Sequence, residues 1–177
     1  MKSILTVLAT ATLLLVFAGK APAEQILVFP ADKPVFSIGF PDDWKVKPDP
    51  DYAKGISVFS PDKEIEIELW VLDDKWVRPD PVKAIEKSVE EVSIIVREWV
   101  TVEEVDPPET FTHNGIRFFR RKGAGKARED GSPIKVSAYF FSPDKKSIFV
   151  LMYWGSEAAE RKYNRQLKRI AHSVRRP

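Results

Sequence analysis

The segment 148–154 constrains the fold more than any other part of this sequence. Along an extended strand, successive side chains alternate between the two faces of a sheet. Here the alternate positions are apolar on both faces, with Val150 and Met152 on one and Leu151 and Tyr153 on the other. A strand of this kind needs apolar cover on both sides. The segment is therefore predicted to lie at the centre of a sheet, between two packed layers.

Other segments have the composition of strands, and one dipeptide marks a hairpin. Asn114-Gly115 is typical of a two-residue hairpin turn, and it separates Thr110–Thr112 from Ile116–Phe119. The segment 123–132 is rich in glycine and charge and is interpreted as a loop. Apolar or alternating runs predict further strands at 35–40, 56–59, 65–72, 100–105 and 134–141.

Two amphipathic helices are predicted between and after these strands. Asp80-Pro81 is a favourable helix start, because Asp accepts hydrogen bonds from the first N–H groups and Pro fits the first turn. Apolar residues then recur at helical spacing as far as Trp99. A terminal helix is expected to begin at Ser156 and to end near Val174. The order of strands, helix, strands and helix predicts an α+β fold, an antiparallel sheet of about six or seven strands with packed helices.

The N-terminal segment has the pattern of a cleaved signal peptide. Lys2 precedes an uncharged stretch from Ile4 to Ala18, and Ala21-Pro22-Ala23 has the small-x-small pattern of a cleavage site. The apolar stretch is shorter than the roughly 20 residues of a membrane span, which argues against the alternative of a retained anchor. We therefore expect a signal peptide over 1–23 and a single globular domain over 24–177, periplasmic or secreted. No second apolar run of spanning length follows.

Two phrases of the sequence resemble a known superfamily. An apolar strand followed by Pro41-Asp42-Asp43-Trp44, and the closing Ile170-Ala171-His172-Ser173-Val174, are similar to the PsbP/Mog-like superfamily, which includes the DcrB-like exported bacterial proteins. The resemblance implies an α/β/α sandwich built on an antiparallel sheet, with the Trp44 ring buried at the end of a strand. That superfamily carries no shared catalytic residues, so none is transferred to this chain.

The residues that carry most enzyme chemistry are scarce. The chain has no cysteine and two histidines. His113 adjoins the Asn-Gly turn, and His172 lies at the end of a basic helix, where a cation suits the helix dipole. No metal-ligand spacing and no nucleophile elbow is present. We therefore assign no catalytic, cofactor or metal residue, and an enzyme is not supported.

A basic segment is the first candidate binding surface. Its cations interleave with Phe118 and Phe119 and are Arg117, Arg120, Arg121, Lys122, Lys126 and Arg128. Such patterning can bind nucleic acid, but export and a formally neutral mature chain argue against it. An acidic envelope protein or anionic lipid headgroups are the expected partners. The alternative is that these cations pair across strands with Glu64, Glu66 and Glu68. Alternation places Arg117 and Arg121 on one face of the strand and Arg120 on the other.

Trp70 and Trp76 form the second candidate, a groove between the sheet and a helix; the alternative is that they belong to the core. Two functions from different classes follow. The leading hypothesis is an exported, non-catalytic accessory or protein-binding domain of the envelope. The alternative is a small-ligand carrier or hydrolase that uses a pocket between sheet and helix.

Overall fold

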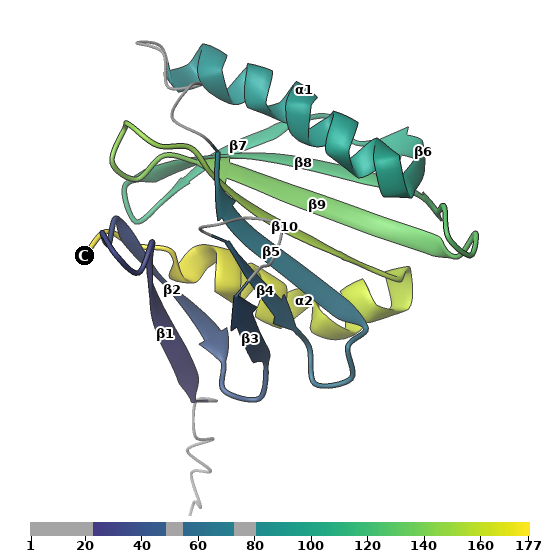
Figure 1. Ribbon diagram of the computed structural model, residues 1–177, viewed down its shortest axis with the longest axis horizontal. Coiled ribbons are helices and arrows are strands. Elements are labelled where there is room, and N and C mark those ends of the chain that lie inside the picture. Colours follow the sequence, from purple (N-terminus) through teal and green to yellow (C-terminus); the bar gives the residue numbers. More distant parts are fainter. Residues whose placement is uncertain (1–22, 49–54, 73–80) are drawn as a thin grey trace, which may run out of the picture.

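An eight-stranded antiparallel sheet forms the middle of the molecule (Figure 1). The computed structural model describes residues 23–48, 55–72 and 81–177. The strands follow the order β3-β4-β5-β10-β9-β8-β6, and β7 pairs with the free part of β8. Their bounds are β3 Lys45–Pro48, β4 Ile56–Phe59, β5 Ile65–Val71, β6 Val100–Val105, β7 Glu109–His113, β8 Ile116–Ala127, β9 Pro133–Phe141 and β10 Phe149–Gly155.

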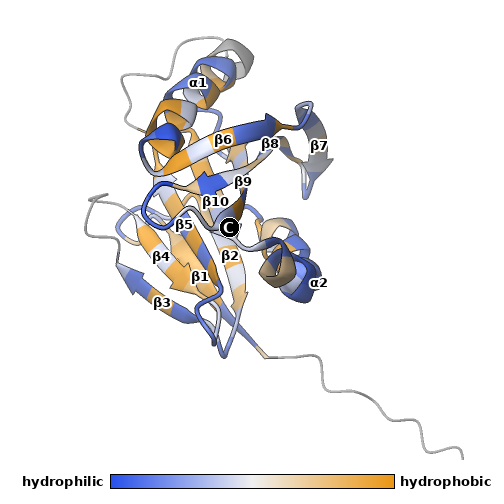
Figure 2. Ribbon diagram, turned by 90° about the vertical axis from the view of Figure 1, so that its right-hand side faces the viewer, coloured by the Kyte–Doolittle hydropathy of each residue, from blue (hydrophilic) through white to orange (hydrophobic). Residues whose placement is uncertain are grey.

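The two helices cover opposite faces of this sheet (Figure 2). Helix α1, Pro81–Trp99, packs on one face together with a core that includes Val92, Val96 and Phe140. Helix α2, Glu157–Ser173, packs on the other face, beside a two-stranded sheet of β1, Glu24–Phe29, and β2, Phe36–Pro41. The predicted sandwich of helices on an antiparallel sheet is confirmed.

Strand β10 lies at the centre of the sheet, as its apolar pattern predicts. It pairs with β5 on one side and β9 on the other. Val150 and Met152 contribute to the core beneath α1, whereas Leu151 and Tyr153 contribute to the core beneath α2. The strand therefore connects two hydrophobic cores through the sheet.

The local signals at turns and helix starts are borne out where the structure describes them. Asn114 and Gly115 have φ angles of 49° and 71°, which is the conformation of the turn that joins β7 to β8. The Ser156 hydroxyl accepts a hydrogen bond of 3.1 Å from the N–H of Ala159, so Ser156 caps α2. Asp80 and residues 1–22 of the predicted signal segment 1–23 lie outside the described residues. Among the described helices, none is long and apolar enough to cross a membrane.

Three strand assignments differ from the sequence prediction. Strand β8 continues to Ala127, so half of the expected loop 123–132 is strand. Gly125 makes this possible, because a Cβ there would lie 2.1 Å from the carbonyl oxygen of Thr101 on β6. Strand β3 is absent from the sequence prediction. Its exposed lysines and terminal proline are typical of an edge strand. Strand β1 was not predicted; its Ile26 faces solvent.

The Trp44 ring is buried, as the resemblance implies. It is 2% exposed and makes an edge-to-face contact with Tyr163 of α2, with ring centroids 5.4 Å apart. The corner after β2 is thus held against the second helix.

Candidate binding cleft beneath helix α1

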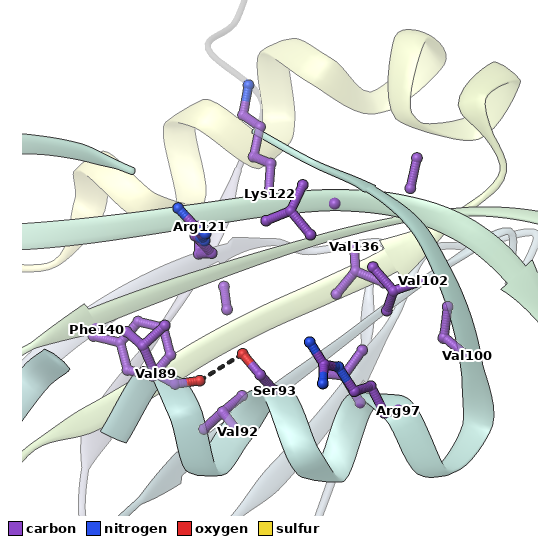
Figure 3. A pocket seen from close by; sticks show the side chains of 15 residues that line it. Val89, Val92, Ser93, Arg97, Val100, Val102, Arg121, Lys122, Val136 and Phe140 are labelled. Carbon is purple, nitrogen blue, oxygen red and sulfur yellow. Dashed lines mark hydrogen bonds between the residues drawn. The ribbon is translucent and has the colours of Figure 1, made fainter. Parts of the chain in front are cut away.

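Strand β8 divides the predicted basic cluster between the two faces of the sheet. Arg121 lines a cleft beneath α1, and Arg117 lies near Ile85 of the same helix. Arg120 points the other way and contacts Tyr139 in the α2-side core. In Figure 3 the side chain of Lys122 also points away from α1. The alternation predicted for Arg117, Arg120 and Arg121 is present, but the cations do not form one surface.

Two cations of the predicted cluster, Arg120 and Lys126, form ion pairs with glutamates. Arg120 forms an ion pair with Glu109 and a 3.4 Å hydrogen bond to the Tyr139 hydroxyl. Partial burial disfavours the charged form of Arg120, but these two partners raise its pKa. Lys126 lies 3.2 Å from Glu103 on the neighbouring strand β6, so it is paired rather than free in a loop.

Arg128 stabilises the end of helix α1. Its Nε donates a 2.9 Å hydrogen bond to the carbonyl oxygen of Arg97, and its backbone N–H donates one of 2.8 Å to that of Trp99. A cation beside the last carbonyls of a helix satisfies them and suits the helix dipole. The sequence predicts that some of the charge of this basic segment, especially Lys122, Lys126 and Arg128, remains free. For Lys126 and Arg128 this prediction is wrong, because both side chains have partners.

The alternative pairing with the glutamates of β5 is also wrong. Strands β10 and β9 separate β5 from β8, so Glu66 and Glu68 cannot lie opposite the β8 cations. Glu64, which precedes β5, instead accepts a 3.2 Å hydrogen bond from Lys162 of α2.

Trp70 belongs to the core beneath α1. It is 2% exposed and packs in the cluster that contains Val92, Phe140 and Met152. It is therefore not the wall of an open groove, and the alternative interpretation as a core residue is the correct one. Trp76, the other residue of that prediction, lies outside the described residues.

The structure does contain a cleft between the sheet and a helix, beside the predicted position. It lies between α1, β6, β8 and β9 and has a volume of about 80 Å³ (Figure 3). Most of the residues that line it are small and aliphatic. Valine and alanine side chains leave space that larger side chains such as leucine would fill. The lining is Val89, Val92, Ser93, Val96, Arg97, Val100, Val102, Val105, Arg121, Lys122, Gly123, Ala124, Val136, Ala138 and Phe140.

Two arginines give this apolar cleft a positive charge. Arg97 rises from α1 toward the strands (Figure 3), and Arg121 comes from β8. Within the described ranges, neither guanidinium has a hydrogen bond or an ion pair, and no acidic side chain lines the cleft. The Ser93 hydroxyl donates a 2.6 Å hydrogen bond to the Val89 carbonyl. The cleft therefore offers apolar walls, uncompensated positive charge and one hydroxyl oxygen.

Comparisons with known proteins identify the fold. No protein-family model matches the chain, and no curated protein matches its sequence. Solved structures do match: CyanoP, the cyanobacterial PsbP of Synechocystis sp. PCC 6803, has a TM-score of 0.63 at 8% identity over 90% of this chain and 96% of that one. LpqN of Mycobacterium tuberculosis, described as involved in cell envelope biogenesis, has a TM-score of 0.60 at 14% identity over 87% and 92%. The Ran-binding protein Mog1p of Saccharomyces cerevisiae has a TM-score of 0.55 at 9% identity over 87% of this chain and 95% of that one.

The chain has the PsbP/Mog-like fold. The superfamily resemblance read from the sequence is thus confirmed at the level of the fold. At these identities the PsbP/Mog-like fold carries no site residue to this chain, so the cleft is described by its own residues.

Sequence reasoning missed Arg97 and Ser93 as residues of the cleft beneath α1. Val89, Ser93 and Arg97 follow one another at four-residue spacing and so share one flank of α1. That flank adjoins the apolar stripe that faces the sheet. A polar residue and a cation beside such a stripe are the sequence signal that could have identified Ser93 and Arg97 as lining residues.

The two histidines meet on the opposite side of the molecule. The rings of His113 and His172 stack with centroids 4.5 Å apart, beside a cavity of about 560 Å³ that both polar and apolar residues line. Burial lowers the pKa of His172, and the nearby His113, Arg120 and Lys168 lower it further. The described residues contain no group of three side chains that could hold a metal ion. The turn interpretation of His113 omitted this contact.

Proposed function

We propose that this chain is an exported, non-catalytic binding domain of the cell envelope, which binds an acidic protein partner at the cleft beneath α1. The observation that carries this proposal is the presence of Arg97 and Arg121, from different elements, at one apolar cleft without an acidic counterpart in the described part of the chain. Apolar walls lower the local dielectric and strengthen attraction to a carboxylate. Arginine can also bind a carboxylate with two parallel hydrogen bonds.

Two of the structurally similar proteins support a binding role in this setting. LpqN is described as involved in cell envelope biogenesis, and Mog1p is described as a Ran-binding protein. The signal-peptide pattern at 1–23 supports export. The DcrB-like character of the chain stays a prediction from sequence.

The composition of the cleft supports binding rather than catalysis. Among the residues that the structure describes, Ser93 is the one hydroxyl residue of the lining, and no histidine or carboxylate lines the cleft with it. A serine nucleophile needs an adjacent base within hydrogen-bond reach. The hydrogen bond from Ser93 to Val89 also commits the hydroxyl proton to the helix backbone.

A site-specific cross-linking experiment tests this proposal. Val105 lines the cleft and is 45% exposed, whereas Ile94 of α1 is 61% exposed and does not line the cleft. A photoreactive residue at position 105, in the chain expressed in its native cells, should form a covalent adduct with a protein. The same residue at position 94 is the matched control and should form little or none.

Charge reversal then identifies the interaction that holds the partner. Arg121→Glu should remove the adduct at position 105, and Arg120→Glu, which changes the opposite face of β8, should leave it. Vesicles of phosphatidylglycerol and of phosphatidylcholine test the lipid alternative. Arg121-dependent binding to phosphatidylglycerol vesicles with no protein adduct would show that lipid headgroups are the partner and would overturn the proposal. Equal adducts at positions 105 and 94 would also overturn it.

A further inference from the structure

We propose that the cleft beneath α1 captures the C-terminus of its partner, and that the partner's last residue has a short branched aliphatic side chain. The side chain would fill the valine-lined cavity, and the terminal carboxylate would bind Arg97 and Arg121. The preceding amide N–H would donate to the Ser93 oxygen. This inference rests on the proposed function and adds the chemistry of the segment that is bound.

The size of the cavity limits the apolar group. Its volume of about 80 Å³ is roughly half of the cavity of about 150 Å³ that accommodates a benzene ring. Three or four carbons of a valine, leucine or isoleucine side chain fit this space, whereas an aromatic ring or a long acyl chain does not. Phe140 and the valines Val92, Val136 and Val102 surround it with apolar atoms.

The charges of the cleft select a carboxylate. Arg97 reaches the cavity from the helix and Arg121 from the strand, so two guanidinium groups border one small apolar space. A C-terminal residue presents its carboxylate and its side chain on the same carbon atom. It can therefore place the anion beside the arginines while the side chain enters the cavity, an arrangement that an internal aliphatic residue cannot offer.

The Ser93 hydroxyl distinguishes a peptide from a simple fatty acid. Its proton is already donated to the Val89 carbonyl over 2.6 Å, so the remaining lone pairs of Oγ can only accept a hydrogen bond. A peptide carries an N–H two bonds from its terminal carboxyl carbon. A short fatty acid has no such donor and would leave the lone pairs of the Ser93 oxygen without one in a partly dehydrated site.

Titration calorimetry with synthetic ligands tests the proposal. The reference ligand is an N-acetylated Gly/Ser hexapeptide that ends in Leu, and three further ligands change its carboxylate, its terminal side chain or its peptide chain. Its C-terminal amide should bind at least tenfold more weakly, because the charge on the carboxylate is lost. The same peptide ending in Phe should also bind at least tenfold more weakly, because the ring exceeds the cavity. The acid 4-methylpentanoate, which lacks the amide, should bind more weakly than the peptide.

Variants of the protein test the assigned contacts. Arg121→Gln and Arg97→Gln should each weaken binding of the Leu-terminated peptide about tenfold and reduce the preference for the acid over the amide. Arg120→Gln, on the other face of β8, should change neither affinity. Ser93→Ala should weaken binding of the peptide and leave the affinity for 4-methylpentanoate unchanged. A merely structural effect on α1 would weaken both.

The outcomes separate the two proposals. Equal binding of the peptide acid and amide, or of the Leu and Phe peptides, would overturn the C-terminus proposal. Failure of every peptide to bind, together with an Arg121-dependent adduct at position 105, would overturn it as well and leave the proposed function standing. Failure of both the peptides and the cross-link would overturn both.

Discussion

The two faces of the sheet differ in how the side chains beneath each helix pack. On the α2 face, aromatic rings pack against one another, as between Phe36 and Phe149, whose centroids lie 4.9 Å apart. On the α1 face, valines and alanines leave a cleft of about 80 Å³. The two faces also differ in whether their cations are paired. Lys162 and Arg169 on α2 pair with acids, whereas Arg97 and Arg121 beneath α1 have no partner among the described residues.

This difference supports the proposed division between a face that contributes mainly stability and a face that binds. A layer of packed aromatic rings gains dispersion and hydrophobic energy. A face with small side chains and unpaired arginines gains less of this energy, and it contains a positively charged cleft. The predictions below test this division, from the largest expected effect to the smallest.

Removal of a large ring from the α2 side should destabilise the protein most. Trp44→Ala should lower the free energy of unfolding by about 3 to 5 kcal/mol, as truncation of a buried aromatic residue does. Val102→Ala, beside the cleft on the α1 side, should cost about 1 kcal/mol because its surroundings are already open. Urea denaturation measures both. Equal losses for the two variants would contradict the division between the faces.

Elements with a strong local pattern could be predicted from the sequence. Strand β10 was predicted at the centre because both of its faces are apolar, and the β7–β8 turn was predicted from Asn114-Gly115. The start of α2 was predicted from Ser156, whose hydroxyl needs only the next turn of helix to act as a cap. In each case the deciding interactions lie within a few residues.

The candidate site depends on contacts between distant segments and was predicted only in part. Arg121 was among the predicted binding residues, but Arg97, its neighbour across the cleft, lies on another element. The partner of Arg120 was expected on β5 and is Glu109 on β7, because the strand order places β9 and β10 between β8 and β5. Strand order and helix placement follow from the whole chain, and no local pattern contains them.

Adjacent arginines on β8 offer a direct comparison of the two faces. Arg120→Gln should lower the free energy of unfolding by about 1 kcal/mol, because it removes the bonds to Glu109 and to the hydroxyl of the buried Tyr139. Arg121→Gln should change it by less than about 0.5 kcal/mol, since no described residue pairs with this guanidinium. A larger loss for Arg121→Gln in urea denaturation would show that Arg121 has a structural role.

Filling the cleft should have opposite effects on stability and on binding. Ala138 lines the cavity on β9, opposite Arg121 on β8. Ala138→Val should raise the free energy of unfolding by about 0.5 kcal/mol, because added methyl groups fill space that is now empty. The same variant should weaken the Leu-terminated peptide in calorimetry. A loss of stability would mean that the cavity is too narrow for two more methyl groups and that its walls are already packed.

The smallest expected effect is a pH dependence on the α2 side, at the stacked histidines. Burial, His113, Arg120 and Lys168 all lower the pKa of His172 below its ordinary value of 6.5. Between the lowered pKa and 6.5, the unfolded chain therefore binds a proton more readily than the folded chain, and stability rises with pH. The contribution of His172 is fully present above pH 6.5 and is lost as the pH falls through the folded-state pKa. Melting temperatures between about pH 5 and 8 should show this decline in the native chain. The decline should be smaller in His172→Gln, which keeps a hydrogen-bonding side chain without the titration. Identical pH profiles for the two proteins would show that protonation of His172 does not change the stability of the folded state.

The α1 side offers the matched comparison. Arg97 and Arg121 keep their charge throughout this pH range, so their glutamine variants should follow the pH profile of the native chain.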